Sequence, residues 1–356
     1  MEPTLKGNEP MSYIFFAATP FHLICINEIH KRDPSKKFEL ILTLYKQNNF
    51  ANKQIYKTLE ILGFEKYTVW YLSINPILNY FKNLLFTYKL FNRSHSKNLT
   101  ITMIDFRNSF MHSLRRFFKG AKFILIDDGF QTYFSYKKYI NNGYYLTRDR
   151  YLNLNGIILR WVYFGRQYKY LLRKKIDIFS IYVNDFSLID KDYLHNDLRH
   201  LKKLISANSL PNWDTNKVFF IGTKLSERGA MSLDDELFCM EWLNSYWKSK
   251  GKTMTYIAKR SSSKEKLMLI SKIGINVLRF DLPLEIGLMH EKVLPGFVCS
   301  TGSTLLKTLP MLYDGIKYYL VDFSSFYKNS SDLEEAKFTK EFFENKNIKF
   351  LSIDKD

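Results

Sequence analysis

Short apolar runs alternate with amphipathic segments in the first third of this chain. Runs rich in aromatic and β-branched residues predict strands at 13–18, 38–45, 66–72, 99–104 and 121–126. Between several of these runs, apolar side chains recur at helical spacing and predict helices at 21–30, 53–62 and 109–118. Strands that alternate with helices in this way are typical of βα units on a mostly parallel sheet.

The same alternation returns in the last third of the chain, after a break at Pro211, Asn212 and Asp214. It predicts strands at 217–221, 253–257, 276–280, 294–299 and 317–321, and helices at 233–248 and 264–273. The stretch between, 135–216, has helical segments and one β-like run at 177–183. We therefore predict an α/β protein with two Rossmann-like domains, 11–215 and 216–356.

Composition narrows the class of protein. The 356 residues are 46% hydrophobic, which is ample for a packed core and argues against intrinsic disorder. Three cysteines without a CxxC pair give no disulfide framework and fit a reducing compartment. The longest early stretch without Asp, Glu, Lys or Arg, 11–27, is shorter than the roughly 20 apolar residues of a membrane-spanning helix. No HExxH motif is present, and we expect no metal site.

The charge balance calls for an anionic partner or surface. The chain carries 53 Lys and Arg against 35 Asp and Glu, a formal net charge of +18. Nucleic acid is the general interpretation of such a charge. Here, however, the basic residues lie among aromatic ones in the segments 75–93 and 148–175, a composition that suits contact with anionic lipid headgroups. Ordinary surface helices, whose Lys and Arg stems cover a core, remain the alternative explanation.

Four polar clusters follow predicted strands. In open α/β sheets, ligands bind beyond the carboxyl ends of the strands, so these clusters are candidates by position alone. They are Thr19–His22, Asp127–Gly129, Gly222–Lys224 and Ser300–Thr304.

The adjacent carboxylates Asp127 and Asp128 are the first candidate for chemistry. Two neighbouring carboxylates repel each other, which raises the pKa of one of them toward the range of a general base. Gly129 then allows a tight turn, so that a carboxylate can face a ligand. A plain turn is the alternative, because Asp and Gly are common in turns.

The run Ser300–Thr304, followed by a predicted helix, is the second candidate. Hydroxyls and backbone N–H groups at a helix N-terminus favour anions, so we expect this run to bind phosphate, with N-capping as the alternative. Gly222 and Thr223 form a weaker phosphate loop, and Glu285 is a weak candidate for binding ribose hydroxyls. His22 either packs in the core or contacts a ligand.

In this order, the motifs resemble those of the bacterial sialyltransferases, and most closely glycosyltransferase family 52 with its polysialyltransferase relatives. The resemblance rests on short stretches that together span most of the chain. They are YIFFAATPFHLICINEI at 13–29, ILIDDG at 124–129, FIGTKLSE at 220–227, Pro-Leu-Glu at 283–285 and STGSTLL at 300–306.

The resemblance implies a GT-B fold, in which two Rossmann-like domains with parallel sheets face a central cleft. It also implies inverting, metal-independent transfer of sialic acid from CMP-sialic acid to a glycan hydroxyl, with no cofactor. Asp127, with Asp128 beside it, would be the general base, and His22 would lie on the acceptor side. Ser303 and Thr304 would hold the CMP phosphate, and Glu285 would bind the ribose.

One motif departs from the family pattern. Related enzymes carry a histidine after a strand of the second domain, where this chain has Ala258, and an acidic residue where it has Ser261. Lys259 and Arg260 could neutralise the departing phosphate instead. The departure leaves open a transferase that relies on cations, a different donor such as a UDP-hexose, or a weakened enzyme.

For the whole protein we expect a nucleotide-sugar donor and a glycan acceptor of the lipooligosaccharide, capsule or O-antigen type. The resemblance further implies a cytoplasmic protein in peripheral contact with anionic inner-membrane lipids. We expect no nucleic-acid partner, although a basic nucleic-acid-binding protein is the non-enzyme alternative, and a homodimer stays open.

Overall fold

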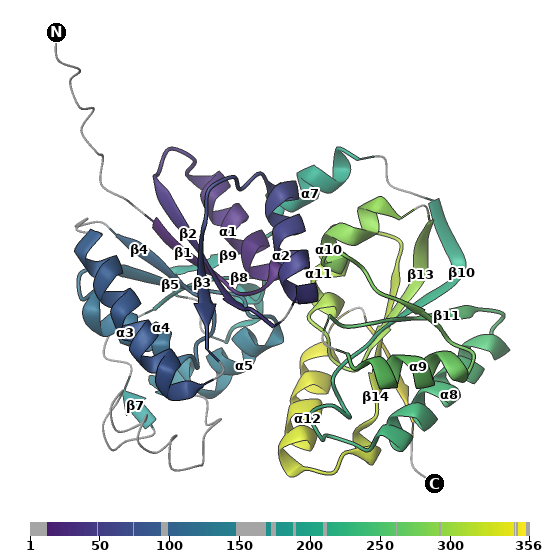
Figure 1. The fold of residues 1–356 in the computed structure, drawn as a ribbon. Helices are drawn as coiled ribbons and strands as arrows, with labels where there is room; N and C mark the ends of the chain where they lie inside the picture. The colour runs from purple at the N-terminus through teal and green to yellow at the C-terminus, as the bar shows by residue number, and fades with distance from the viewer. Residues whose placement is uncertain are drawn as a thin grey trace. The chain divides into compact units, whose positions relative to one another are not determined.

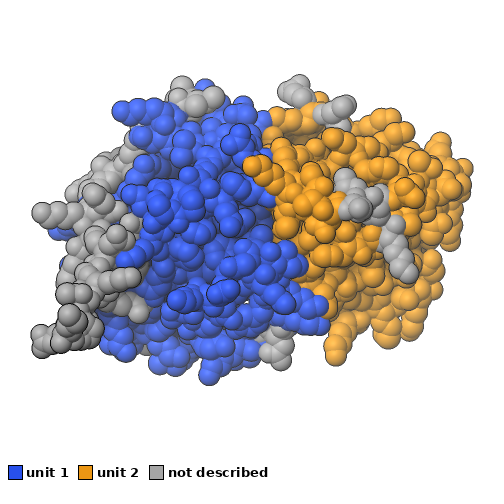
Figure 2. Space-filling model, turned by 90° about the horizontal axis from the view of Figure 1, so that it is seen from above, with its two compact units in different colours: residues 1–200 blue, residues 201–356 orange. Residues whose placement is uncertain are grey.

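The structure, a computed structural model, describes residues 13–353 except 48, 74, 94–98, 147–168, 172–175, 188–189, 209–211, 261, 292, 345 and 347. It divides into two compact units, 1–200 and 201–356, which Figure 2 shows in different colours. The chain therefore divides between residues 200 and 201, whereas the boundary predicted at 215 would cut through a strand, β10 (Asn212–Ile221). Of the basic, aromatic segment 148–175, only 169–171 belong to the described residues.

Unit 1 is built on a seven-stranded parallel sheet in the order β3-β2-β1-β4-β5-β8-β9 (Figure 1). Inner strands such as β1 and β5 are buried along nearly their whole length, as near-continuous apolar runs in parallel sheets usually are. The seven strands are β1 (Tyr13–Ala17), β2 (Phe38–Tyr45), β3 (Thr68–Leu72), β4 (Thr100–Met103), β5 (Lys122–Ile126), β8 (Asp177–Ser180) and β9 (Tyr193–His195). A separate antiparallel pair joins β6 (Tyr144–Leu146) and β7 (Lys169–Leu171).

The helices of unit 1 pack around this sheet (Figure 1). They are α1 (Pro20–Arg32), α2 (Asn49–Leu62), α3 (Pro76–Arg93), α4 (Ser109–Phe117) and α5 (Phe130–Lys138), with short 3₁₀ turns at Ile140–Asn142 and Val183–Asp185. Helix α1 begins at Pro20, one residue before the predicted start, and ends two residues after the predicted end: Thr19 is its N-cap, and basic residues fill its last turn. Helix α7 (Arg199–Ser206) crosses the division between the units.

Unit 2 repeats the architecture with a six-stranded parallel sheet in the order β12-β11-β10-β13-β14-β15. Its other strands are β11 (Thr253–Ile257), β12 (Asn276–Leu278), β13 (Val293–Ser300), β14 (Lys317–Asp322) and β15 (Lys349–Ser352). Its helices are α8 (Leu233–Ser249), α9 (Lys264–Lys272), α10 (Leu284–Gly287), α11 (Leu305–Leu312) and α12 (Ser330–Glu344), with 3₁₀ turns at Leu288–His290 and Ser324–Phe326.

Both sheets follow the doubly wound strand order, which confirms the α/β class and the two Rossmann-like units. In each sheet, the chain adds strands first in one direction and then in the other. This reversal occurs between two central neighbours, β1 and β4 in unit 1 and β10 and β13 in unit 2. The carboxyl ends of those strands mark the place where ligands bind in this architecture. Among the described residues, no helix combines the length and apolarity that a membrane crossing requires.

Candidate functional site

The Asp127 carboxylate is enclosed within unit 1, directly after β5. Asp127 is 0% exposed. Its Oδ1 accepts a hydrogen bond from the Ser180 hydroxyl at 2.5 Å, and its Oδ2 accepts one from the Ile181 N–H at 2.8 Å. Burial raises the pKa of Asp127 to about 7, while these hydrogen bonds oppose the shift and Asp128 adds to it. The predicted rise in pKa is present, but its main cause is burial, and the carboxylate has no exposed surface in this structure.

Asp128 is the carboxylate of the pair that solvent can reach, since its side chain is 32% exposed. Its backbone N–H donates to the Thr132 hydroxyl at 2.8 Å, which fixes the turn into α5. Gly129 adopts a φ of 68°, a left-handed conformation that glycine accepts without strain. The geometry therefore favours Asp128 over Asp127 for contact with a ligand.

His22 lies beside Asp128, so the structure brings together two residues that the sequence places more than a hundred positions apart. The ring of His22 is buried, and its Nε2 lies 3.4 Å from Oδ1 of Asp128. Its Nδ1 accepts the N–H of Ala18 at 3.1 Å. Because Nδ1 acts as an acceptor, the neutral ring carries its proton on Nε2, on the side of the Asp128 carboxylate.

Arg107 is a candidate in unit 1 that the motifs did not select. It follows β4, one of the two strands at which the strand order reverses. Its Nε and Nη2 atoms are buried without a hydrogen-bond partner among the described residues, and its Nε lies 3.8 Å from Oδ1 of Asp105. Buried guanidinium donors of this kind are suited to an anion. A cation just after the strand predicted at 99–104 is the sequence signal that could have found it.

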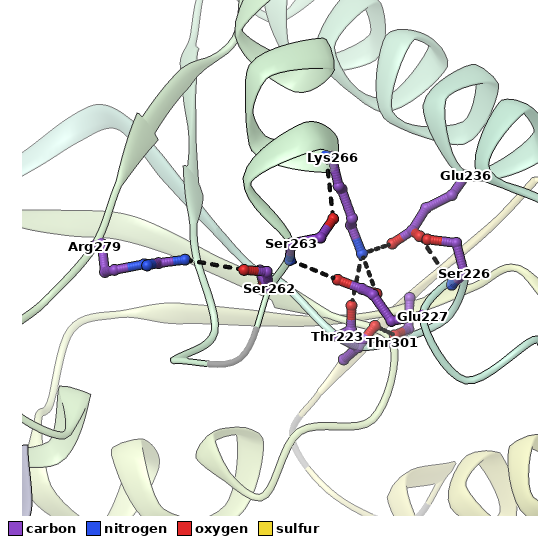
Figure 3. Close-up of polar contacts among 9 residues, drawn as sticks. All are labelled: Thr223, Ser226, Glu227, Glu236, Ser262, Ser263, Lys266, Arg279 and Thr301. Carbon is purple, nitrogen blue, oxygen red and sulfur yellow. Dashed lines mark hydrogen bonds and ion pairs between the residues drawn. The ribbon is translucent and has the colours of Figure 1, made fainter. Parts of the chain in front are cut away.

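In unit 2, the loops after β10 and β13 meet at the equivalent reversal. The hydroxyl oxygens of Thr223 and Thr301 are 2.8 Å apart (Figure 3). Gly222 is required by packing, because a Cβ atom there would lie 2.3 Å from the phenol oxygen of Tyr256. Gly302 has a φ of 126°, which side-chain-bearing residues rarely adopt. Two hydroxyls and two glycines thus line the place where a Rossmann-like unit binds phosphate.

The Ser/Thr run 300–304 lies between β13 and α11, as the predicted phosphate loop requires. Ser300 is fully buried: its hydroxyl donates to the Ile221 carbonyl at 3.3 Å and accepts the Ser303 N–H at 3.3 Å. Ser303 and Thr304 are partly exposed. The Ser303 hydroxyl accepts the Leu305 N–H at 3.3 Å, whereas Thr304, the N-cap residue, makes no capping hydrogen bond with its side chain. The run combines a buried anchor with two hydroxyls near the surface.

Cations gather around the ends of β10 and β11. Desolvation lowers the pKa of Lys259, and the neighbouring cations Arg260, Lys224 and Arg228 lower it further. Lys259 nevertheless keeps exposed surface, and Arg260 is partly exposed, so an anion can reach both side chains. Mutual repulsion among cations is relieved when a phosphate binds, which favours an anionic ligand here.

Ala258 and Glu285 lie inside unit 2. Ala258 is 8% exposed and packs in the hydrophobic core, and the expected acidic position, Ser261, is outside the described residues. Glu285 is 6% exposed and accepts the Thr308 hydroxyl at 3.1 Å. Burial raises the pKa of Glu285. This carboxylate is engaged between α10 and α11, so the geometry gives little support to the ribose role predicted for it.

The part of the chain that the structure describes contains no group of three or more His, Cys, Asp or Glu side chains that could bind a metal ion. The chemistry available to unit 1 is that of a partly exposed carboxylate beside a buried imidazole. The chemistry available to unit 2 is that of hydroxyls and cations suited to phosphate.

No protein-family model matches the chain, and no curated protein matches its sequence. Solved structures do resemble it. A protein described as a UDP-N-acetylglucosamine 2-epimerase from Listeria monocytogenes has a TM-score of 0.52 at 10% identity, over 97% of this chain and 85% of that chain. The UDP-GlcNAc 2-epimerase from Methanocaldococcus jannaschii has a TM-score of 0.50 at 9% identity, over 97% and 89%.

An α/β-galactoside α-2,3-sialyltransferase from Photobacterium phosphoreum has a TM-score of 0.49 at 9% identity, over 95% of this chain and 97% of that chain. The chain has the GT-B fold, as its two parallel sheets and its likeness to the two epimerase structures show. At such low identity, likeness establishes the fold alone. The activity has to be argued from the residues of each unit.

Proposed function

We propose that this chain is a glycosyltransferase that moves sialic acid from CMP-sialic acid to a glycan hydroxyl, with inversion and without a metal. The observation that carries the proposal is the placement of complementary chemistry at the carboxyl ends of neighbouring strands in each of the two sheets. Unit 1 offers the Asp128 carboxylate beside His22, and unit 2 offers the Thr223–Thr301 contact with Lys259 and Arg260 nearby. The GT-B fold and the sialyltransferase-like motif order support the same activity.

In the proposed reaction, Asp128 accepts the proton of the acceptor hydroxyl as its oxygen forms a bond to the anomeric carbon. The bond from that carbon to the phosphate oxygen breaks, and CMP leaves with both bonding electrons. Lys259, Arg260 and the loop hydroxyls would stabilise the charge that grows on the phosphate, a role in which preorganised donors are most effective. Because CMP is a good leaving group, the reaction does not require an acid at position 258.

Asp128 replaces Asp127 as the proposed base because of its surroundings. Asp127 is satisfied by Ser180 and Ile181 and has no exposed surface. Asp128 is partly exposed, and its Oδ1 lies 3.4 Å from Nε2 of His22, which leaves Oδ2 for the acceptor. A general base must come within hydrogen-bond reach of the proton that it removes.

A transfer assay with mass-spectrometric detection tests the donor. The full chain is incubated with galactose-terminated acceptors and a panel of CMP- and UDP-sugars. A mass increase of one sialic acid, with CMP-sialic acid only, supports the proposal. Transfer from a UDP-hexose alone would establish the second candidate, which Ala258 favours because it stands in place of the expected histidine. Turnover of UDP-sugars without any acceptor would identify an epimerase instead.

The glycan acceptor has a candidate location in unit 1, a surface cavity of about 700 Å³ beside α2. Tyr56 and Tyr71 offer aromatic faces to sugar rings, and Lys46 is one of three lysines that line the cavity. The cavity includes residues at the carboxyl end of the sheet, the edge that also carries Asp128. Replacing Tyr71 by Ala should therefore raise KM for the acceptor and leave KM for the donor unchanged.

Peripheral contact with anionic lipids is the remaining part of the proposal, and helix α3 supports it. Leu78, Leu85 and Tyr88 are 49%, 55% and 62% exposed and fall on one side of the helix. Lys82 and Lys89 are exposed on the adjoining side. An exposed apolar stripe next to a row of cations is typical of helices that lie in the interface of an anionic membrane.

Vesicle sedimentation tests this contact. The full chain should sediment with vesicles that contain phosphatidylglycerol and stay in solution with pure phosphatidylcholine. The Leu85→Ser, Tyr88→Ser variant should lose sedimentation, whereas a matched pair on unit 2, Met268→Ser with Leu333→Ser, should keep it. Equal sedimentation of both variants would remove α3 as the contact, and a change of mass in analytical ultracentrifugation would indicate a homodimer surface instead.

A further inference from the structure

A buried lysine stands behind the phosphate loop of unit 2. Lys266, in the first turn of α9, is 1% exposed, so it does not touch a ligand. Its ammonium group donates to the Thr223 carbonyl at 2.9 Å, to Oε2 of Glu227 at 3.0 Å and to Oε1 of Glu236 at 2.5 Å (Figure 3). All three N–H donors of the ammonium group are therefore used.

The two carboxylates tie this lysine to the loop after β10 from both sides. Glu236, on α8, also accepts the Ser226 N–H at 3.1 Å. Glu227 accepts the Ser263 N–H at 3.4 Å, next to the start of α9 (Figure 3). The lysine thus connects the loop 222–227 to α8 and α9. One ammonium between two carboxylates leaves a local charge of −1 (+1 − 2), so charge balance alone does not account for the arrangement.

The contact with Thr223 is the part that reaches the phosphate loop. A trans peptide is planar, with its C=O and N–H on opposite sides, so a fixed Thr223 carbonyl also fixes the direction of the Lys224 N–H. That N–H then points away from the buried ammonium. A reversed peptide would instead present the carbonyl oxygen, which repels a phosphate.

We propose that Lys266 is a positioning residue of the donor site: it holds the peptide between Thr223 and Lys224 so that the Lys224 N–H and the Thr223 hydroxyl face the donor phosphate. This inference rests on the proposed role of unit 2 as the nucleotide-sugar site. Lys266 acts on the ligand only through Thr223, whose hydroxyl already meets that of Thr301.

A double variant that conserves the local charge, together with a single-variant control, tests the assignment. Lys266→Met alone would leave two buried carboxylates without a cation, which is strongly destabilising. Combining it with Glu236→Gln keeps the local charge at −1 (0 − 1) and removes the bond to Thr223. The matched control, Glu236→Gln alone, changes the same cluster but keeps that bond. Calorimetry with CMP and with UDP gives Kd for each full-length protein, and thermal unfolding gives Tm.

The double variant should bind the nucleotide about 10- to 100-fold more weakly, as loss of a hydrogen bond to a charged group implies. Glu236→Gln, which keeps the bond to Thr223, should bind the nucleotide about 10- to 100-fold more tightly than the double variant, and Lys266→Arg, which retains N–H donors, should keep most of the wild-type affinity. A double variant with lowered Tm but wild-type Kd would overturn the positioning role. A wild type that binds neither CMP nor UDP would overturn the proposed function itself.

Hydrogen exchange on the wild type gives a second test that needs no variant. Saturating nucleotide should slow amide exchange in the peptide that covers 222–226, because the Lys224 N–H would then donate to the phosphate. Unchanged exchange in this peptide, under conditions where calorimetry shows binding, would contradict the proposal.

Discussion

Nε2 of His22 lies 3.4 Å from Oδ1 of Asp128, while the carboxylate of the preceding residue, Asp127, faces Ser180 inside unit 1. Two adjacent carboxylates therefore have opposite surroundings. The enclosed one has its pKa raised to about 7 and two hydrogen bonds to its own unit. The other is partly exposed at the carboxyl end of β5.

Replacing Asp128 by Asn should abolish transfer while donor binding persists. Asn keeps the size of the side chain but cannot take the proton from the hydroxyl of the glycan acceptor. Loss of a general base lowers the rate about 100- to 10,000-fold. The measurement is kcat for transfer together with the Kd for CMP. The control is Asp127→Asn, which should retain near-wild-type kcat. If Asp127→Asn loses transfer and Asp128→Asn keeps it, the base is Asp127, as the motif resemblance implies.

The raised pKa of Asp127 predicts a pH-dependent stability. Between the unfolded pKa of about 3.9 and the folded value of about 7, the folded chain retains a proton that the unfolded chain has lost. The free energy of unfolding should therefore decrease with rising pH in this window, by up to about 1.4 kcal/mol per pH unit from this group. Below and above the window, Asp127 should contribute no slope.

Asp127→Asn isolates that contribution, because Asn can still accept from Ile181 and donate to Ser180 but does not titrate. Urea unfolding of both proteins at pH 5, 6, 7 and 8 gives the comparison. The stability of the variant relative to the wild type should rise from pH 5 to pH 7 and then level off. Parallel pH profiles for the two proteins would mean that Asp127 is ionised throughout this range.

The cations at the end of β11 should dominate nucleotide binding. We expect Arg260→Ala, and Lys259→Ala independently, to weaken CMP binding about tenfold, in line with loss of a charge-assisted hydrogen bond. Added salt should weaken wild-type binding more than binding by either variant, because the variants have fewer charges to screen. Lys191→Ala, an exposed lysine of unit 1, is the control and should leave Kd unchanged. Equal salt dependence in all four proteins would show that these side chains do not contact the phosphate.

The strand and helix pattern of the sequence predicts most of the two sheets, because buried parallel strands appear as continuous apolar runs. The run at 38–45 and the run at 253–257 match β2 and β11 residue for residue. Shorter or more polar elements were not predicted from the sequence. Strand β9 has three residues and β15 has four, and both lie at a sheet edge, where fewer apolar side chains are needed.

The candidate sites were predictable only as far as strand ends reveal them. The pattern locates the pair Asp127 and Asp128, but successive side chains after a strand point to opposite sides. Which of the two is enclosed depends on Ser180, which arrives on β8 from 53 residues further along the chain. Lys266 is similarly hidden, since its partners Glu227 and Glu236 come from a loop and another helix.

Gly222 offers a last test of the phosphate loop, through packing. A Cβ atom at this position would lie 2.3 Å from the Tyr256 phenol oxygen and 2.5 Å from the nearest ring carbon. Gly222→Ala should therefore displace the loop or the ring, which lowers the free energy of unfolding by about 1–3 kcal/mol and weakens nucleotide binding. Gly120→Ala is the matched control, because no atom lies within 4 Å of the added Cβ there. Denaturant unfolding and calorimetry with CMP measure both effects. A Gly222→Ala protein with wild-type stability and affinity would show that the Tyr256 ring yields freely and that the loop does not depend on this glycine.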